Sequence, residues 1–327
     1  MKPFIGVKCQ AASRLHFGLI DLGHATARRY GGAGLAIAHP SVSVIAEHAF
    51  KTSVVFTDVA SSDYRSECEE TLERALRNQP GGVKITVEAS PEHHIGLGSK
   101  TSILLALLAS VNLLLDLGLG PHDLIKLSGR GGTSGIGINC FFSGGFVIDG
   151  GRRDEQNEPF QPSRYNAFSE PPPLRLHRTF PDKWDITLAI FPGRKVEGCI
   201  ERDLFATSTP IPRSECYEAI SLAYIDLVEA IDRTDIQLLS NTLARFNDIG
   251  FKKREVENQP TGIQSALTAF QKLPNTAAGM SSMGPTLFVI TRRSDAEAID
   301  RVRHLAQDAT LLTTHASVKG HHLERLS

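Results

Sequence analysis

The alternation of strand and helix patterns along the 327-residue chain predicts an α+β protein in two lobes. Residues 2–60 carry short β-branched runs separated by turn residues, whereas the second half opens with the strand-like stretch WDITLAIF and continues with long amphipathic helices. Between the halves, residues 152–182 are polar and rich in Pro and Arg. Because a loop of that length is usually functional or a linker, we expect domains over 1–170 and 171–327.

Within each half the elements follow from local pattern. The first half predicts a polar helix over 62–78, the strand GVKITVEAS, a helix after Thr101 that is apolar on nearly every side, a short helix from Pro121 to Leu127 and a strand in GGFVIDGG. The second half predicts helices over 213–231, 235–249 and 260–272, a glycine loop leading to a strand in AAGMSSMGPTLFVIT, a helix capped by Ser294, and a strand in ATLLTTHASV.

Composition excludes several classes of protein. A net charge of −1 gives no support for a nucleic-acid partner. The apolar helix after Thr101 is interrupted by Ser110, Asn112 and Asp116, so we expect no membrane span. The N-terminus lacks the apolar region of a signal peptide. Five widely spaced cysteines without a C-x-x-C pair indicate reduced, mainly buried thiols in a cytoplasmic protein.

The stretch PEHHIGLGSKTS, residues 91–102, places a glycine-rich turn directly before the apolar helix. A helix N-terminus offers free N–H groups and a positive dipole end, which bind anions. Gly96 and Gly98 would let the backbone approach a phosphate, Ser99 and Thr101 would donate hydroxyls, and Lys100 would add a charge. The alternative is a plain strand-to-helix turn. The His93-His94 and His321-His322 pairs lack metal-ligand spacing, and we expect them at the surface.

Three known glycine motifs do not fit. The Lys of GLGSKT is out of place for a Walker loop, and Thr101 and Ser134 stand where a dinucleotide fingerprint needs glycine. The hydrolase pattern G-x-S-x-G is also missing. Arginine pairs such as Arg28-Arg29 could serve an anionic ligand or be solvated surface charge.

The order of the motifs is more specific than any one of them. SRLHFGLIDLG, PEHHIGLGSKTS, GRGGTSGIGINCFFSGG and GMSSMGPT occur in sequence from Ser13 to about Thr286. Together they resemble the GHMP superfamily of small-molecule kinases, which implies an S5-domain-2-like N-terminal lobe and a ferredoxin-like C-terminal lobe. Many of these kinases carry G-x-P-S-G-x-D, whose Asp acts on the substrate hydroxyl. Gly137 occupies that position here and cannot take a proton.

A narrower family matches these departures. SRLHFGLIDL, GLGSKT, GRGGTSGIG with GGFVIDGG, FNDIGFKKREVENQ and GMSSMGPT resemble β-ribofuranosylaminobenzene 5′-phosphate synthase. The resemblance implies an enzyme that joins phosphoribosyl pyrophosphate (PRPP) to an aromatic carboxylic acid and releases CO2 and pyrophosphate. It also implies Mg2+ as the cofactor and a homodimer. The acceptor stays open between 4-aminobenzoate, 4-hydroxybenzoate and a pyrazole-type acid, and the pathway between pterin cofactor and nucleoside antibiotic. An ATP-dependent kinase and a non-catalytic sensor of a phosphorylated metabolite are the alternatives.

The implied reaction needs two anion sites and polar groups around the ribose C1. We assign one phosphate group to GLGSKT and the other to Arg130, Gly131, Gly132, Thr133 and Ser134, with the two assignments interchangeable. Arg14 and His16 lie on one face of a strand, where they could bind an anion and act as an acid–base group. Asp21 could hold Mg2+ or the ribose hydroxyls, or form a structural ion pair with Arg14. Ser281 and Ser282 either line the cleft or form a tight turn.

Overall fold

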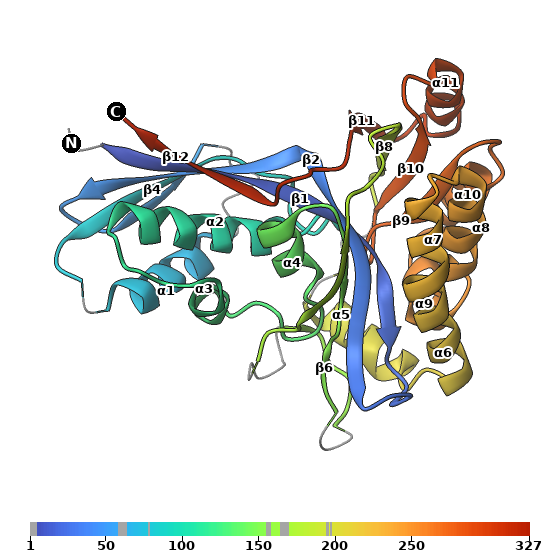
Figure 1. Ribbon diagram of the computed structural model, residues 1–327, viewed down its shortest axis with the longest axis horizontal. Helices are drawn as coiled ribbons and strands as arrows, with labels where there is room; N and C mark the ends of the chain where they lie inside the picture. The colour runs from blue at the N-terminus through green and yellow to red at the C-terminus, as the bar shows by residue number, and fades with distance from the viewer. Residues whose placement is uncertain are drawn as a thin grey trace.

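The computed structural model describes residues 5–57, 64–77, 79–154, 158–163, 170–193, 196 and 198–327, which form two sheets with helices (Figure 1). The larger sheet has eight strands, ordered β12-β1-β2-β4-β3; β5 and β6 also pair with β2, and β7 pairs with β5. Its strands are β1 (Gly6–Asp21), β2 (Arg28–Ala49), β3 (Ser53–Phe56), β4 (Gly82–Ala89), β5 (Phe146–Asp149), β6 (Arg152–Arg153), β7 (Leu174–Arg178) and β12 (His321–Leu326). All pairings are antiparallel except that of β3 with β4.

Four helices cover one face of the first half of this sheet: α1 (Arg65–Leu76), α2 (Ser99–Leu114), α3 (Pro121–Ser128) and α4 (Ile136–Ser143) (Figure 1). Thirteen of the sixteen residues of α2 are buried, which confirms the prediction of a helix enclosed on nearly every side. The structure has no helix long and apolar enough to cross a membrane among the residues it describes. All five cysteines are free thiols, and Cys199 alone of them is exposed.

The smaller sheet is antiparallel, in the order β11 (Thr310–Thr314), β8 (Trp184–Ile190), β10 (Thr286–Arg292), β9 (Ala277–Met280). Its helices are α5 (Gly198–Ser208), α6 (Arg213–Ser221), α7 (Leu227–Asp232), α8 (Ile236–Asn247), α9 (Gly250–Glu257), α10 (Thr261–Gln271) and α11 (Ala296–Leu305). The helix expected over 213–231 is α6 and α7 joined by the π-helical turn η3 (Leu222–Asp226). Asp295, rather than the predicted Ser294, caps α11, since its carboxylate accepts from the N–H of Ala298 at 3.0 Å.

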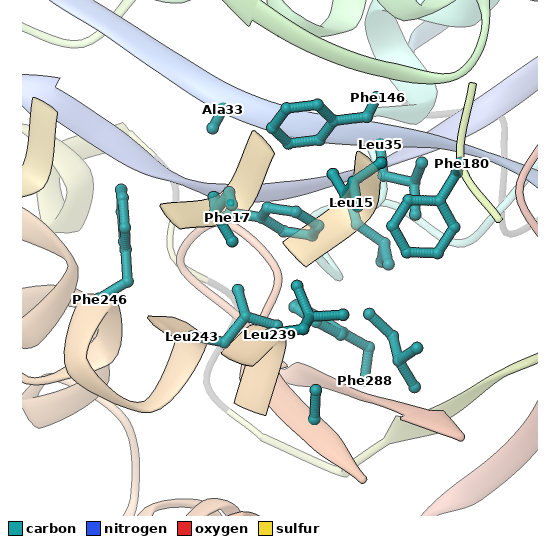
Figure 2. Packing of buried hydrophobic residues seen from close by; sticks show 14 of the residues in the cluster. Leu15, Phe17, Ala33, Leu35, Phe146, Phe180, Leu239, Leu243, Phe246 and Phe288 are labelled. Carbon is teal, nitrogen blue, oxygen red and sulfur yellow. The ribbon is translucent and has the colours of Figure 1, made fainter. Parts of the chain in front are cut away.

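The two lobes share one hydrophobic core. Phe17 on β1 stacks on Phe288 of β10, with ring centroids 5.3 Å apart, and lies 6.1 Å from the ring of Phe146 on β5. Leu243 and Phe246 of α8 belong to the same cluster (Figure 2). Burial of these side chains against one another fixes the angle between the lobes, and therefore the walls of any site at their junction.

The boundary predicted at residue 170 needs a correction. β7 pairs with β5, and β12 pairs with β1, so two strands from the region assigned to the second domain belong to the first sheet. A β-bridge between Ile37 and Ala316 marks where the chain returns. Local pattern carries no information on such long-range pairing.

Candidate active site

Three segments far apart in the sequence meet at the middle of β1. The Arg14 N–H donates to the Leu97 carbonyl of the glycine-rich turn at 3.1 Å. His16, the next residue on the same face of β1, binds the glycine loop GMSSMGPT, residues 279–286, which we call the late loop. Its N–H donates to Ser281 Oγ at 3.0 Å, and its carbonyl accepts from the Ser282 N–H at 2.8 Å. Backbone hydrogen bonds thus fix the positions of both side chains that β1 presents.

Close packing at this junction requires glycine. Gly96 has φ +87°, and a Cβ there would lie 2.3 Å from the Ser281 carbonyl oxygen. Gly98 has φ +78°, and Arg14 lies over it, with Cγ and Nε 3.0 Å from where a Cβ would stand. The Arg14 guanidinium also donates to the Gly96 carbonyl. The glycines therefore admit both the late loop and Arg14 to the start of α2.

Two adjoining cavities open here, one of about 130 Å³ and one of about 430 Å³. Both are lined by Arg14, Thr101, Arg130, Glu201, Ser282 and Met283. The smaller adds His16, Gly131, Thr133, Ser134, Gly137 and Glu255, and the larger adds Glu67, Gly96, Gly98, Ser99 and Lys100. We call them the inner and the outer cavity.

Two guanidinium groups stand where the cavities join. Burial lowers the pKa of Arg14 to about 10, with a further contribution from nearby Arg130, and both remain protonated at neutral pH. Arg130 Nε donates to Thr101 Oγ1 at 3.1 Å, and neither arginine has a carboxylate within ion-pair distance in the described part of the chain. A half-buried pair of like charges of this kind is suited to an anion that bridges them.

A hydrogen-bonded chain forms one wall of the inner cavity. His16 Nε2 lies 3.0 Å from Ser134 Oγ, which donates to Asp149 Oδ2 at 3.1 Å. Burial, then the charges of Arg14 and Lys252, hold the pKa of His16 well below 6.5, so its imidazole is neutral. Burial raises the pKa of Asp149 to about 7, against the lowering effect of its hydrogen bonds from Gly151, Ser134 and Gly135.

A buried ion pair forms the floor beneath the late loop. Lys252 and Glu255, three residues apart on α9, are 1% and 2% exposed, with Nζ 2.5 Å from Oε2. Lys252 Nζ also donates to the Ser282 carbonyl at 2.7 Å and the Met280 carbonyl at 3.3 Å. Charges this deep are found chiefly where function requires them, because burial of a pair gains little stability.

Comparison with known proteins assigns this arrangement to a family. Residues 64–145 match the GHMP kinases N-terminal domain and residues 227–304 the GHMP kinases C-terminal domain. The chain is 33% identical to a β-ribofuranosylphenol 5′-phosphate synthase from Archaeoglobus fulgidus over 295 residues, which cover 90% of each chain. The chain belongs to the β-ribofuranosylphenol 5′-phosphate synthase family. It is an enzyme of the pentosyltransferase type, as the resemblance implied.

The fold of this synthase family member is that of the GHMP kinases, as expected. A homoserine kinase from Cytophaga hutchinsonii superposes with a TM-score of 0.70 at 15% identity, covering 99% of this chain and 98% of the kinase. A phosphomevalonate kinase from Streptococcus pneumoniae gives 0.69 at 15% identity, covering 96% and 100%. Gly137 lines the inner cavity in the first turn of α4.

Most of the predicted site residues of this synthase family member meet at the cavities. Lining them are Arg14, His16, Gly96, Gly98, Ser99, Lys100, Thr101, Arg130, Gly131, Thr133, Ser134 and Ser282. Gly132 lies behind the lining, where its carbonyl accepts from Arg152 at 2.9 Å. Ser281 is fully buried and links the His16 N–H to the Gly96 carbonyl, so it joins the two segments instead of facing the cavities.

Asp21 does not reach either cavity. Its carboxylate accepts from the N–H groups of Gly23, Ala25 and Thr26 and from Thr26 Oγ1, at 2.9 to 3.2 Å, and so holds its own turn in place. This placement corrects the prediction of a magnesium or ribose ligand, and the alternative ion pair with Arg14 is not formed either. Short-range donors claim a carboxylate in a turn before a distant ligand can.

The Arg28-Arg29 pair also lies elsewhere. Arg28 donates to the carbonyls of Gly150 and Gly151, and buried Arg29 donates to Pro159 at 2.9 Å and lies 4.4 Å from the centre of the Phe160 ring. These side chains fasten β2 to the following segment and line neither cavity. The prediction that they bind substrate is therefore corrected.

Histidine placement differs from expectation at one position. His93 is 2% exposed, with its ring centre 3.9 Å from that of Tyr64, so its predicted surface position is wrong.

No cluster of three His, Cys, Asp or Glu side chains able to hold a metal occurs among the described residues. Asp149 and Glu255 entered no predicted site. Lys252 was considered only as part of the cluster Lys252-Lys253-Arg254, which could serve an anionic ligand or be solvated surface charge.

Proposed function

We propose that this enzyme joins the ribose 5-phosphate of PRPP to a one-ring aromatic carboxylic acid, with release of CO2 and pyrophosphate. The observation that carries the proposal is the half-buried pair Arg14 and Arg130 at the junction of two cavities, beside Gly137, where the family resemblance implies an Asp in the kinases. An anion-rich donor and a small anionic acceptor would meet at that pair.

The outer cavity suits PRPP. At about 430 Å³ it is large enough for a sugar with a phosphate and a pyrophosphate group, and it opens onto the N-terminus of α2 with Ser99, Lys100 and Thr101. Arg14 and Arg130 would stand at the inner end, near C1 and its pyrophosphate. Which of the two anionic groups lies on the helix N-terminus stays open between the 5′-phosphate and the pyrophosphate.

The inner cavity suits the acceptor. Its volume of about 130 Å³ is close to that of engineered cavities that hold one benzene ring. Leu19, Ile138, Phe205 and Met283 give it apolar walls, and His16 and Ser134 give it a polar edge. The relatives are named for a ribofuranosylphenol product, which favours 4-hydroxybenzoate over 4-aminobenzoate as the acid.

Magnesium would be bound mainly through the donor. Mg2+ usually takes one or two carboxylates together with substrate phosphates rather than a full protein cage, and the described residues offer no such cage. Glu201, which lines both cavities, and Glu67 of the outer cavity are the carboxylates in position. Bound there, the ion would neutralise charge on the departing pyrophosphate.

The chemistry requires placement more than proton removal from the sugar. As the C1–O bond breaks, its electron pair leaves with pyrophosphate, and the ring carbon bearing the carboxylate attacks C1. The C–CO2 bond then breaks, and its electrons restore the aromatic ring. Arg14 and Arg130 stabilise the charge that develops on the leaving group, and no base is needed where the kinases keep one.

Purified protein incubated with Mg2+, PRPP and a panel of one-ring acids tests the proposal. We expect pyrophosphate and CO2 in equal amounts with at least one acid, with 4-hydroxybenzoate the best of them. Consumption of ATP with indifference to PRPP would instead establish a kinase. Saturable PRPP binding without turnover of any acid would establish a sensor.

A further inference from the structure

The hydrogen bonds around Ser134 determine the state of His16. A serine hydroxyl has one proton and two lone pairs. When Asp149 is ionised, the Ser134 proton points to Asp149 Oδ2 at 3.1 Å, and one lone pair accepts from the Ile136 N–H at 3.1 Å. The second lone pair is left for His16 Nε2 at 3.0 Å, which must therefore carry the imidazole proton. His16 Nδ1 then holds a free lone pair, and it is buried without a hydrogen-bond partner among the residues described.

We propose that His16, Ser134 and Asp149 form a proton relay for the ring hydroxyl of the acceptor. The inference rests on the proposed function, to which it adds a proton path and an acceptor class. A hydroxyl-substituted ring is a much stronger carbon nucleophile once its hydroxyl is ionised, and the relay would remove that proton at the moment of attack.

Each proton in the step is accounted for. The hydroxyl proton passes to His16 Nδ1, the Nε2 proton passes to Ser134 Oγ, and the Ser134 proton passes to Asp149 Oδ2. The phenolate electrons move through the ring to the carbon bearing the carboxylate, which bonds to C1 as pyrophosphate leaves. After CO2 departs, the same path in reverse returns the proton to the product hydroxyl.

The surroundings favour a neutral end state. Asp149 is wholly buried and accepts from the Gly135 and Gly151 N–H groups at 3.0 and 2.8 Å, so its position is fixed. The titratable groups around Asp149 are Arg28, Cys140 and Tyr224, and those around His16 are Arg14 and Lys252. Because two cations face His16, a proton that arrives there is passed on to the carboxylate rather than held as imidazolium.

Asp149→Asn separates the relay from a structural role. The amide keeps one acceptor oxygen, for the N–H of either Gly151 or Gly135, and cannot take a proton. The loss of the other contact affects both acids alike, so the comparison between the two acids isolates the relay. With 4-hydroxybenzoate, we expect kcat to fall by a factor of about 10² to 10³. With 3,5-difluoro-4-hydroxybenzoate, whose hydroxyl is already ionised at neutral pH, the variant should keep its rate within a few-fold of the parent enzyme. Equal loss with both acids would overturn the relay.

Ser134→Ala provides a second test that leaves Asp149 and its backbone contacts in place. We expect the same selective loss and the same rescue by the fluorinated acid, with circular dichroism and thermal unfolding unchanged within a few degrees. A variant that retains full activity on 4-hydroxybenzoate would contradict the proposal. Absence of turnover by the parent enzyme with either acid would instead count against the proposed function itself.

Discussion

Gly137 shows how the absence of one side chain can change the chemistry of a cavity. It lies in the wall of the inner cavity, and a Cβ there would be 3.2 Å from Thr101 Cγ2. Arg14 and Arg130 line the same cavity, and Gly137 adds no side chain to it. The cavity is therefore suited to anionic reactants.

Gly137→Asp is expected to abolish turnover of PRPP without creating a kinase. The new carboxylate would project into the inner cavity, repel the anionic reactants and pair with Arg14 or Arg130. The other residues of the acceptor pocket would remain those of this enzyme. Release of ADP from ATP in the presence of small alcohols measures the gain, and pyrophosphate release measures the loss. Gly137→Ala, which adds the Cβ without charge, separates crowding from electrostatics. Measurable ATP-dependent phosphorylation by the Asp variant would contradict the expectation.

Lys100 is the half-buried cation of the glycine-rich turn. It forms an ion pair with Glu67, and its Nζ lies 5.2 Å from the centre of the Tyr64 ring. A charge-assisted contact to phosphate is worth about 1.5 to 3 kcal/mol, so Lys100→Ala should weaken PRPP binding by a factor of about 10 to 100 with folding intact. Isothermal titration gives the affinity. Lys84→Ala, on β4 and paired with Glu47, is the control that should bind normally.

Residues close in sequence were predictable, and residues joined only by tertiary pairing were not. Arg14 and His16 share a face because strand geometry has period two. Asp21 was misjudged because donors from its own turn reach it first. Asp149 owes its place to the antiparallel register that sets it opposite Gly32 of β2, and no local signal reports that register.

At the level of elements, the glycine-rich turn and the late loop act as one unit. Gly96→Ala forces a side chain into left-handed backbone and against the Ser281 carbonyl, so we expect a loss of at least about 3 kcal/mol in free energy of unfolding. Gly118→Ala has a similar φ, +66°, with nothing within 4 Å of its Cβ, and should cost about 1 kcal/mol. Urea titration measures both. Equal losses would show that contact with the late loop is unimportant.

Helix predictions succeeded where periodicity was strong. The buried α2 and the amphipathic α8 and α10 lie where expected. The helix α9, short and rich in charge, was missed because its buried face carries Lys252 and Glu255, which a hydrophobic pattern reads as exposed. The β1–β2 hairpin is longer than its local signals imply, since turn residues within it are absorbed by irregular pairing near Ala11 and His16.

For the whole molecule, Asp149 links stability to pH. Its carboxyl has a pKa of about 7 in the folded protein against 3.8 in the unfolded chain, so between these values the folded state binds more protons. Stability contributed by this group is therefore present at low pH and falls as pH rises toward 7. Asp149→Asn removes that dependence. Because only the parent loses this stability as the pH rises, the free energy of unfolding of the variant minus that of the parent should increase by up to a few kcal/mol between pH 5 and 8.

Urea unfolding of both proteins at pH 5 and pH 8 checks this. Asp300→Asn, an exposed position on α11, should show no such change. A difference between parent and Asp149→Asn that is independent of pH would mean that the carboxyl titrates normally.

The homodimer implied by the family resemblance stays a prediction, to be measured by light scattering.

β12 has a consequence for how the chain is made. The Ile5 N–H donates to the Leu326 carbonyl at 2.9 Å, and β12 covers the edge of β1, the strand that bears Arg14 and His16 (Figure 1). On the ribosome β1 emerges long before β12, so the first sheet waits with an open edge until the whole second lobe has been translated. Substrate-binding competence is thus a late event in biogenesis, and any nascent chain arrested earlier offers chaperones an unpaired strand.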